Sequence, residues 1–176
     1  MKLIIFLFAL TITACKTAEI APYEVNPERF GKSANTVYEN ARLNQKKDAP
    51  TFGLSGQYEI MKGDKLVFEY IFVKEDNPNI ADDEFTETLV FETDTNITNK
   101  TFKDGEIMKQ KAIYRYLCYC IPVGELKETK GTISITRLSA ESYQVVADVD
   151  FIFKPAENFT DPVTWQVDFD KIFTVK

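Results

Sequence analysis

Apolar and polar side chains alternate with a period of two along most of the chain after residue 50. Residues 52–60 show the pattern first, with large apolar side chains separated by small or polar ones. This spacing is typical of a β-strand that turns one face toward a core. The polar residues at 62–65 then predict a turn into a second apolar segment at 66–73, and therefore a hairpin.

The same period recurs in later segments, which are predicted to be strands. They span residues 84–93, 97–103, 106–109, 111–121, 131–138, 143–153 and 163–175. Asp104-Gly105, between the second and third of them, suits a type I′ hairpin turn because both central residues of that turn need positive φ. No helical period competes after Pro50, so the sequence lacks the crossover helices that a parallel sheet requires.

Seven to nine short strands in about 126 residues predict an all-β domain, and we expect an antiparallel β-sandwich. The alternative is a closed β-barrel. Gly56-Gln57-Tyr58 resembles the Gly-x-Trp motif that opens lipocalin-like barrels, with Tyr in the place of Trp. The resemblance covers three residues, and the same glycine also fits a sheet position that another backbone approaches closely.

The strands on either side of residues 139–142 are expected to form a hairpin, because the connection is short. Their apolar positions share a face only if the numbers of opposed residues add to an even value. We expect a total of 282, which places Ile133 opposite Val149. Ser134 would then face Asp148 and donate a hydrogen bond to its carboxylate.

Residues 16–50 differ in composition, with three prolines, a polar run at 44–48 and few large apolar side chains. This composition predicts a flexible tether whose ends lie on the order of 30 Å apart. Residues 34–41 also fit a short helix, because four apolar residues recur there at helical spacing. Both conformations stay open at this point, and the folded domain is expected to span residues 51–176.

The first residues have the features of an export signal. Met1-Lys2 is a short basic region, and residues 3–10 are an unbroken apolar stretch that is too short to cross a membrane as a helix. Ile12-Thr13-Ala14-Cys15 follows. This order of an aliphatic, a small polar and a small residue before cysteine resembles the lipobox of bacterial lipoproteins.

The lipobox resemblance implies that residues 1–14 are a signal peptide and that residues 15–50 carry the lipidated cysteine and the tether. Cys15 would be the first residue of the mature protein, with a diacylglyceryl group on its thiol and an acyl group on its amine. Each buried methylene of these chains contributes about 0.8 kcal/mol to membrane attachment. Lys16 favours the outer membrane, because in some bacteria an aspartate at this position retains lipoproteins in the inner one. The face of the membrane stays open, and an ordinary secretory signal is the alternative.

Charge and composition exclude several classes of function. The chain has 21 basic and 27 acidic residues, and loss of residues 1–14 leaves 20 basic residues and a net charge of −7. An acidic protein is a poor candidate for nucleic-acid binding, because phosphates need basic partners. The chain has no histidine, which excludes Ser-His or Cys-His catalytic pairs and histidine-ligated zinc. We therefore expect no cofactor and no enzymatic activity.

Cys118 and Cys120 lie in the most unusual run of the chain, Tyr114-Arg115-Tyr116-Leu117-Cys118-Tyr119-Cys120. Both faces of this predicted strand are largely apolar, which favours a central place in the sheet. Side chains two residues apart in a strand point the same way, with Cα atoms near the limit of about 6.8 Å for a disulfide. Two buried free thiols are therefore expected. A strained disulfide, a metal site or an intermolecular role is the alternative.

Four aspartates form two pairs at i, i+2 spacing on the outward faces of predicted strands. They are Asp148, Asp150, Asp168 and Asp170. We expect exposed residues on strands that do not pair with each other, because opposed carboxylates repel. The alternative is a cation such as calcium bound between them. Use of two carboxylates as in a glycoside hydrolase would require one of them in a desolvated pocket.

These patterns predict a lipid-anchored envelope protein that acts as a binding or accessory module. Its expected partners are the membrane and either an envelope protein or a small ligand, with no nucleic acid. The alternatives are a lipocalin-like carrier of a small apolar ligand and, third, an envelope hydrolase that uses carboxylates. A continuous cavity lined by Tyr58, Phe68 and Tyr116 would favour the carrier, whereas a filled core favours the binding module.

Overall fold

The computed structural model describes residues 31–46, 57–74, 84–117, 123–155 and 160–176. In chain order these contain β1 (Gly31–Lys46), β2 (Gln57–Lys62), β3 (Lys65–Lys74), β4 (Thr86–Asp94), β5 (Asn99–Lys103), α1 (Gly105–Lys109), β6 (Ile113–Leu117), β7 (Val123–Arg137), β8 (Ser142–Pro155) and β9 (Val163–Val175). The predicted all-β class is confirmed. Within these ranges, no helix has the length and apolar character needed to cross a membrane.

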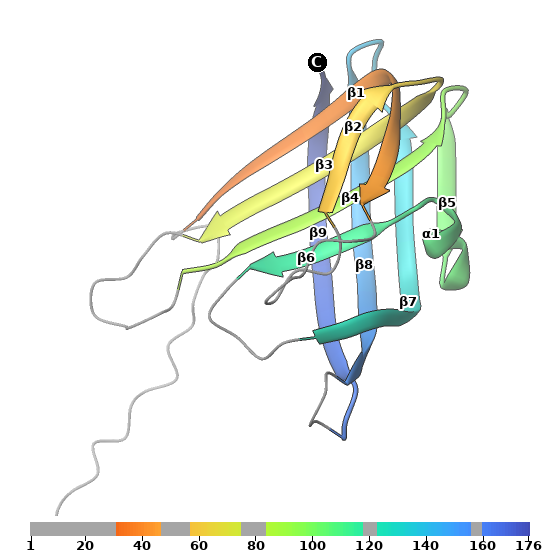
Figure 1. Ribbon diagram of the computed structural model, residues 1–176. Coiled ribbons are helices and arrows are strands. Elements are labelled where there is room, and N and C mark those ends of the chain that lie inside the picture. The colour runs from red at the N-terminus through yellow and green to blue at the C-terminus, as the bar shows by residue number, and fades with distance from the viewer. Residues whose placement is uncertain (1–30, 47–56, 75–83, 118–122, 156–159) are drawn as a thin grey trace, which may run out of the picture.

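Eight strands lie side by side in the order β5-β7-β8-β9-β1-β3-β4-β6, and β2 pairs with β1 outside this series. All pairs are antiparallel except β1 and β9, which run parallel. Figure 1 shows β1, β3 and β4 crossing obliquely over β7, β8 and β9, so that the two groups form the layers of a sandwich. The described sheet ends at β5 and β6 and is not closed, so the closed-barrel alternative is wrong.

The main core lies between these two groups of strands. Phe68 of β3 stacks on Phe91 of β4 with ring centroids 5.2 Å apart, and the edge of Tyr143 from β8 meets Phe68 from the opposite layer. All three side chains are fully buried. Burial of one large apolar side chain contributes about 1.5–3 kcal/mol, so this cluster holds the layers together. Phe68 therefore belongs to a filled core.

β1 corrects the prediction for residues 16–50. Gly31–Lys46 is a strand that pairs with β2, β3 and β9, so neither a tether nor a helix over 34–41 describes it, and the folded domain begins before the predicted boundary. Val37 enters the main core, whereas Tyr38 lies on the opposite face of the strand. Pairing with three strands overrides the weak helical pattern. The rest of this segment lies outside the described residues.

The second half of β1 leaves the sandwich and lies over the outer face of β3 and β4. The chain turns at Asn40, which has a φ of 50°, and the register with β3 shifts at this point. Ala41 and Leu43 then pack against Val67 of β3 and Val90 of β4. We call residues 41–46 together with β2 the β1–β2 cover. It shields apolar side chains that the sandwich would otherwise expose to solvent.

The β1–β2 cover changes the pairing that the sequence predicted for β2. The polar turn between β2 and β3 is confirmed, but in the described sheet β2 pairs with β1 and not with β3, so the predicted hairpin is wrong. Two carboxylates hold the cover in place. Leu43 N–H donates to Glu92 Oε2 at 2.7 Å, and the Tyr58 hydroxyl donates to Glu69 Oε1 at 2.6 Å.

α1 replaces the strand predicted over residues 106–109, so the hairpin predicted at Asp104 is also wrong. Asp104 has the positive φ of a turn residue, 49°, but the chain continues into α1, whose Ile107 is fully buried. Asp104 and Gly131 of β7 exchange two hydrogen bonds of 2.9 Å, one to the Gly131 carbonyl oxygen and one from its N–H. These bonds fasten the start of α1 to β7.

The β7–β8 hairpin has the even register that apolar alternation requires, but not the predicted pairing. Ile133 faces Ala147, so opposed residue numbers add to 280 rather than 282. The Leu138 N–H donates to the Ser142 carbonyl oxygen at 3.0 Å and closes the loop one residue earlier than expected. Alternation fixes whether the total is even or odd, whereas the loop decides which even value is adopted.

Candidate functional site

A groove of about 910 Å³ opens where β1 and β9 diverge. These strands pair only near the C-terminal end of β9, through Thr36 with Thr174 and Val37 with Val175. Away from this contact the two layers cross, and Figure 1 shows β1 running away from β9. The volume falls within the range of about 300–1,000 Å³ that is usual for small-molecule sites.

Aromatic rings line the groove from both layers. Tyr70 of β3 stacks on Phe169 of β9, and Tyr116 of β6 stacks on Trp165 of β9, each with centroids 4.2 Å apart. Phe85, which precedes β4, extends the second stack with its centroid 4.7 Å from that of Tyr116. Rings in a stack cover one another's facing surfaces, and their remaining faces and edges give the groove large apolar walls that suit a ligand with an apolar body.

A carboxylate, Glu87 of β4, lies within the aromatic lining. Strand alternation places it there, because Glu87 is in phase with Leu89 and Phe91, which are buried in the main core. The Tyr114 hydroxyl donates to Glu87 Oε1 at 2.9 Å. Burial raises the pKa of Glu87 above its ordinary value, and the hydrogen bond from Tyr114 opposes part of this rise.

The charge of Glu87 acts on the tyrosines around it. Burial is the main cause that raises the pKa of Tyr70, Tyr114 and Tyr116, and the Glu87 carboxylate adds to the rise for each. These tyrosines therefore stay protonated at neutral pH. Glu87 is consequently the negative centre of this part of the groove.

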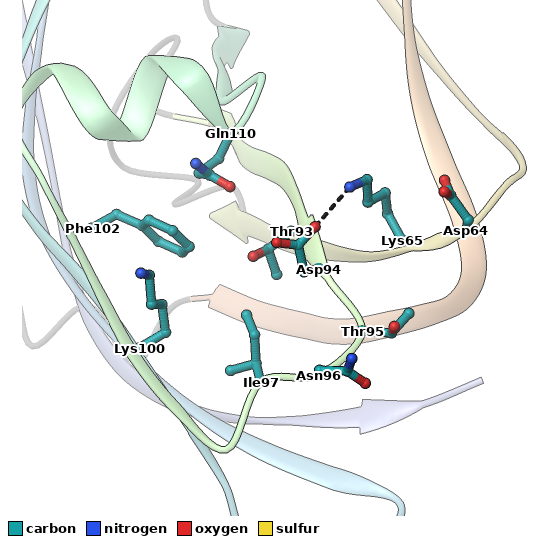
Figure 2. A pocket seen from close by; sticks show the side chains of 10 residues that line it. All are labelled: Asp64, Lys65, Thr93, Asp94, Thr95, Asn96, Ile97, Lys100, Phe102 and Gln110. Atoms are coloured by element: carbon teal, nitrogen blue, oxygen red, sulfur yellow. Dashed lines mark hydrogen bonds and ion pairs between the residues drawn. The ribbon is translucent and has the colours of Figure 1, made fainter.

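A second pocket, of about 540 Å³, lies at the opposite end of β3 and β4 and is more polar. Figure 2 shows Lys65 at the start of β3 facing Asp94 at the end of β4, with Lys100 and Phe102 of β5 on the other side. Lys65 Nζ lies 2.7 Å from Asp94 Oδ1, so these two charges neutralise each other. We call this the polar pocket. It offers a ligand exposed polar groups whose charges are already partly matched.

The predicted acidic positions lie on strands that do pair. Asp148 of β8 directly faces Asp168 of β9, so the expectation of unpaired strands is wrong. Asp148, Asp168 and Asp170 are exposed and Asp150 is half-buried. Water around these carboxylates weakens their repulsion.

Side-chain amides beside these aspartates also reduce the repulsion among them. Gln144 Nε2 donates to Asp170 Oδ1 at 2.9 Å, and Gln166 Nε2 donates to Asp148 Oδ1 at 3.4 Å. Thr132, rather than the predicted Ser134, faces Asp148 across the β7–β8 pair. In the part of the chain that the structure describes, no group of three or more Asp, Glu, Cys or His side chains is arranged to hold a metal ion.

The predicted cysteine sites, Cys15, Cys118 and Cys120, lie outside the described residues. The described part of their strand, β6, pairs with β4 at an edge of the sheet, so the predicted central position is wrong. Tyr114 and Tyr116 share one face of β6 as alternation requires, and this face lines the groove.

The cavity lining expected for a carrier is only partly found. Tyr116 lines the groove, but Phe68 lies in the filled core and Tyr58 belongs to the β1–β2 cover. Sequence reasoning also missed Glu87, although a signal for it was present. A charged residue in phase with the core positions of its strand is unusual and marks a candidate site.

No family model matches this chain, and the comparisons with curated proteins and with solved structures give no match either. The function is therefore argued from the chemistry of the groove.

Proposed function

We propose that the protein is a binding module of the bacterial envelope that holds a small ligand with an apolar body in the groove between β9 and the ends of β3, β4 and β6. The observation that carries the proposal is the pair of stacks formed by Tyr70 with Phe169 and Tyr116 with Trp165. They place ring faces from both layers along one groove of sufficient volume for a small molecule.

Binding suits this groove better than catalysis by carboxylates. Acid–base cleavage of a glycosidic bond needs two carboxyl groups that converge on one bond. In the described groove, Glu87 lies among the rings, whereas Asp168 and Asp170 are exposed on the β9 border. We therefore propose a non-enzymatic role that needs no cofactor.

The proposed location rests on the sequence around Cys15. A lipid on this residue would attach the domain to the outer membrane, and Lys16 is consistent with that destination. The predicted mature chain has a net charge of −7, so anionic headgroups would not attract it and the acyl chains would have to hold it.

Lipid attachment can be tested in bacterial cells supplied with labelled palmitate. Label is expected in the wild-type protein and absent from Cys15→Ser. Equal labelling of the two would contradict lipidation at Cys15 and leave the groove proposal unaffected.

The groove can be tested through Trp165, because it is the only tryptophan in the chain. The fluorescent apolar probe N-phenyl-1-naphthylamine accepts energy from tryptophan when the two are close. We expect saturable energy transfer from Trp165 to the probe, measured on the chain from residue 15 onward with Cys15→Ser so that no lipid competes.

A matched pair of variants locates this binding. Phe85→Ser removes a ring from the stack and is expected to weaken probe binding about tenfold. Ile172→Ser removes an apolar side chain of β9 that is 57% exposed and does not line the groove, and binding should not change. Absence of saturable transfer, or equal binding by the two variants, would contradict the proposal.

A further inference from the structure

We infer that the groove selects organic cations, amines or quaternary ammonium compounds that carry an apolar body. This inference rests on the proposed function and adds the chemical class of the ligand to it. It follows from the position of Glu87 among the aromatic rings.

The lining combines the two features that recognise an organic cation. The aromatic rings of the lining carry a negative potential on their faces, which attracts a cation wherever a face is not covered by a stacked partner. Glu87 supplies a full negative charge between them. Tyr114 donates to one oxygen of Glu87, which fixes the carboxylate beside the rings.

The partly buried charge of Glu87 is not compensated by the groove itself. No cation within the described ranges acts on the pKa of Glu87, which is governed by burial and by Tyr114. Removing a carboxylate from water is costly unless an opposite charge lies nearby. A bound cation would provide that charge, so binding would recover part of the cost that folding imposes at Glu87.

The charges along the border of the groove also favour a cationic ligand. Of the described residues that line the groove, three are acidic and one, Lys171 of β9, is basic. Lys171 has an interaction of its own. Lys74 Nζ lies 5.9 Å from the centre of the Phe85 ring, so one ring of this lining already contacts a cation of the chain itself. An anionic ligand would meet net negative charge.

The experiment compares three competitors of similar shape for the N-phenyl-1-naphthylamine site. They are benzyltrimethylammonium, its neutral isostere neopentylbenzene and the anion phenylmethanesulfonate. For the wild-type groove, the cation is expected to displace the probe at a concentration about tenfold lower than the neutral isostere. The anion should be the weakest competitor.

Two variants assign the preference to Glu87. In Glu87→Gln, which keeps an oxygen for Tyr114, the ratio between cation and neutral isostere should fall to about one, with both competitors measured against this variant's own affinity for the probe. Asp94→Asn is the matched control, because it removes the same charge from the polar pocket, and its ratio should equal that of the wild type.

The possible results separate the two proposals. A wild-type protein that does not bind the probe would contradict the proposed function and this inference together. A protein that binds the probe without preferring the cation, or whose preference survives in Glu87→Gln, would overturn this inference alone.

Discussion

The core is closed at one end of β3 and β4 and borders a groove at the other end. At the end near Asp94, residues of β5, α1 and the loop before them close the core with Ile97, Phe102 and Ile107, all of which are buried. At the end near Glu87, aromatic rings stand along a groove. Both ends are rich in apolar side chains. A closed end therefore needs a segment of chain lying across it, not merely a supply of hydrophobic residues.

The carboxylates at the two ends differ in the same manner. Asp94 is exposed and paired with Lys65, and this pairing lowers its pKa. Glu87 is partly buried beside tyrosines, and this burial raises its pKa. Shifts caused by burial in a groove mark functional sites more often than shifts caused by an exposed ion pair.

The largest effect is expected at Gly131, which binds Asp104 and so fastens the closed end to β7. Its φ of 113° disfavours residues with a Cβ, and a Cβ there would collide with the Asp148 backbone oxygen. Gly131→Ala should reduce the free energy of unfolding by about 3 kcal/mol or more, measured by urea denaturation. Gly105→Ala is the control, because a Cβ at Gly105 meets no atom within 4 Å. Equal losses would contradict this role of Gly131.

The next largest effect concerns the closure itself. Ile107→Ala would leave a cavity under α1 and should cost about 2–4 kcal/mol in urea denaturation. Met108, its neighbour on α1, is 40% exposed, and Met108→Ala should cost less than about 0.5 kcal/mol. Probe binding by the folded Ile107→Ala protein should be unchanged. Similar costs for the two variants would show that α1 does not close the core.

Glu87→Gln should stabilise the protein at neutral pH. Because burial raises the pKa of Glu87 from its ordinary value, the folded state binds a proton at Glu87 more readily than the unfolded state does. Its stability contribution is fully present below the unfolded pKa and is lost as pH rises through the folded pKa. The urea midpoint of Glu87→Gln should therefore exceed that of the wild type at pH 7, with the difference shrinking toward about pH 3. A lower midpoint at pH 7 would contradict an uncompensated charge.

Asp94→Asn should have the smallest effect. The Asp94 side chain is 80% exposed, so water screens its pair with Lys65. The sign is opposite to that of Glu87, because a lowered pKa contributes stability at neutral pH and loses it as pH falls. The urea midpoint should match the wild type within error at physiological salt. A loss as large as that of Ile107→Ala would break the contrast between the two ends.

Alternation predicted the strands in which the pattern of apolar and polar residues is long and regular. It did not predict the strands that form because of the strands they pair with. The strand expected over 163–175 is β9, because Trp165, Val167 and Phe169 alternate clearly with polar residues. β1 was not predicted, because the chain bends at Asn40 and the two halves of the strand bury residues in different clusters. A bent strand has no single period along its sequence.

The candidate site was predictable only in its parts. The phase of Glu87 with Leu89 could have been read from β4, as could the shared face of Tyr114 and Tyr116 on β6. That these residues share a groove with Trp165 could not be read from the sequence, because it depends on how the two layers cross. Crossing follows from strand twist and from long-range pairing, neither of which leaves a local pattern in the sequence.

The short contact between β1 and β9 also makes the groove depend on long-range pairing. Val37 pairs with Val175, so the two layers are joined by hydrogen bonds between segments from opposite ends of the described chain. β1 also pairs with β2 and β3, which follow it directly in the chain, whereas its pairing with β9 spans nearly the whole described chain, and such non-local pairing slows folding. Because β1 and β9 both border the groove, the groove exists only when this long-range contact has formed. Ligand binding would therefore depend on a contact that local structure alone cannot supply.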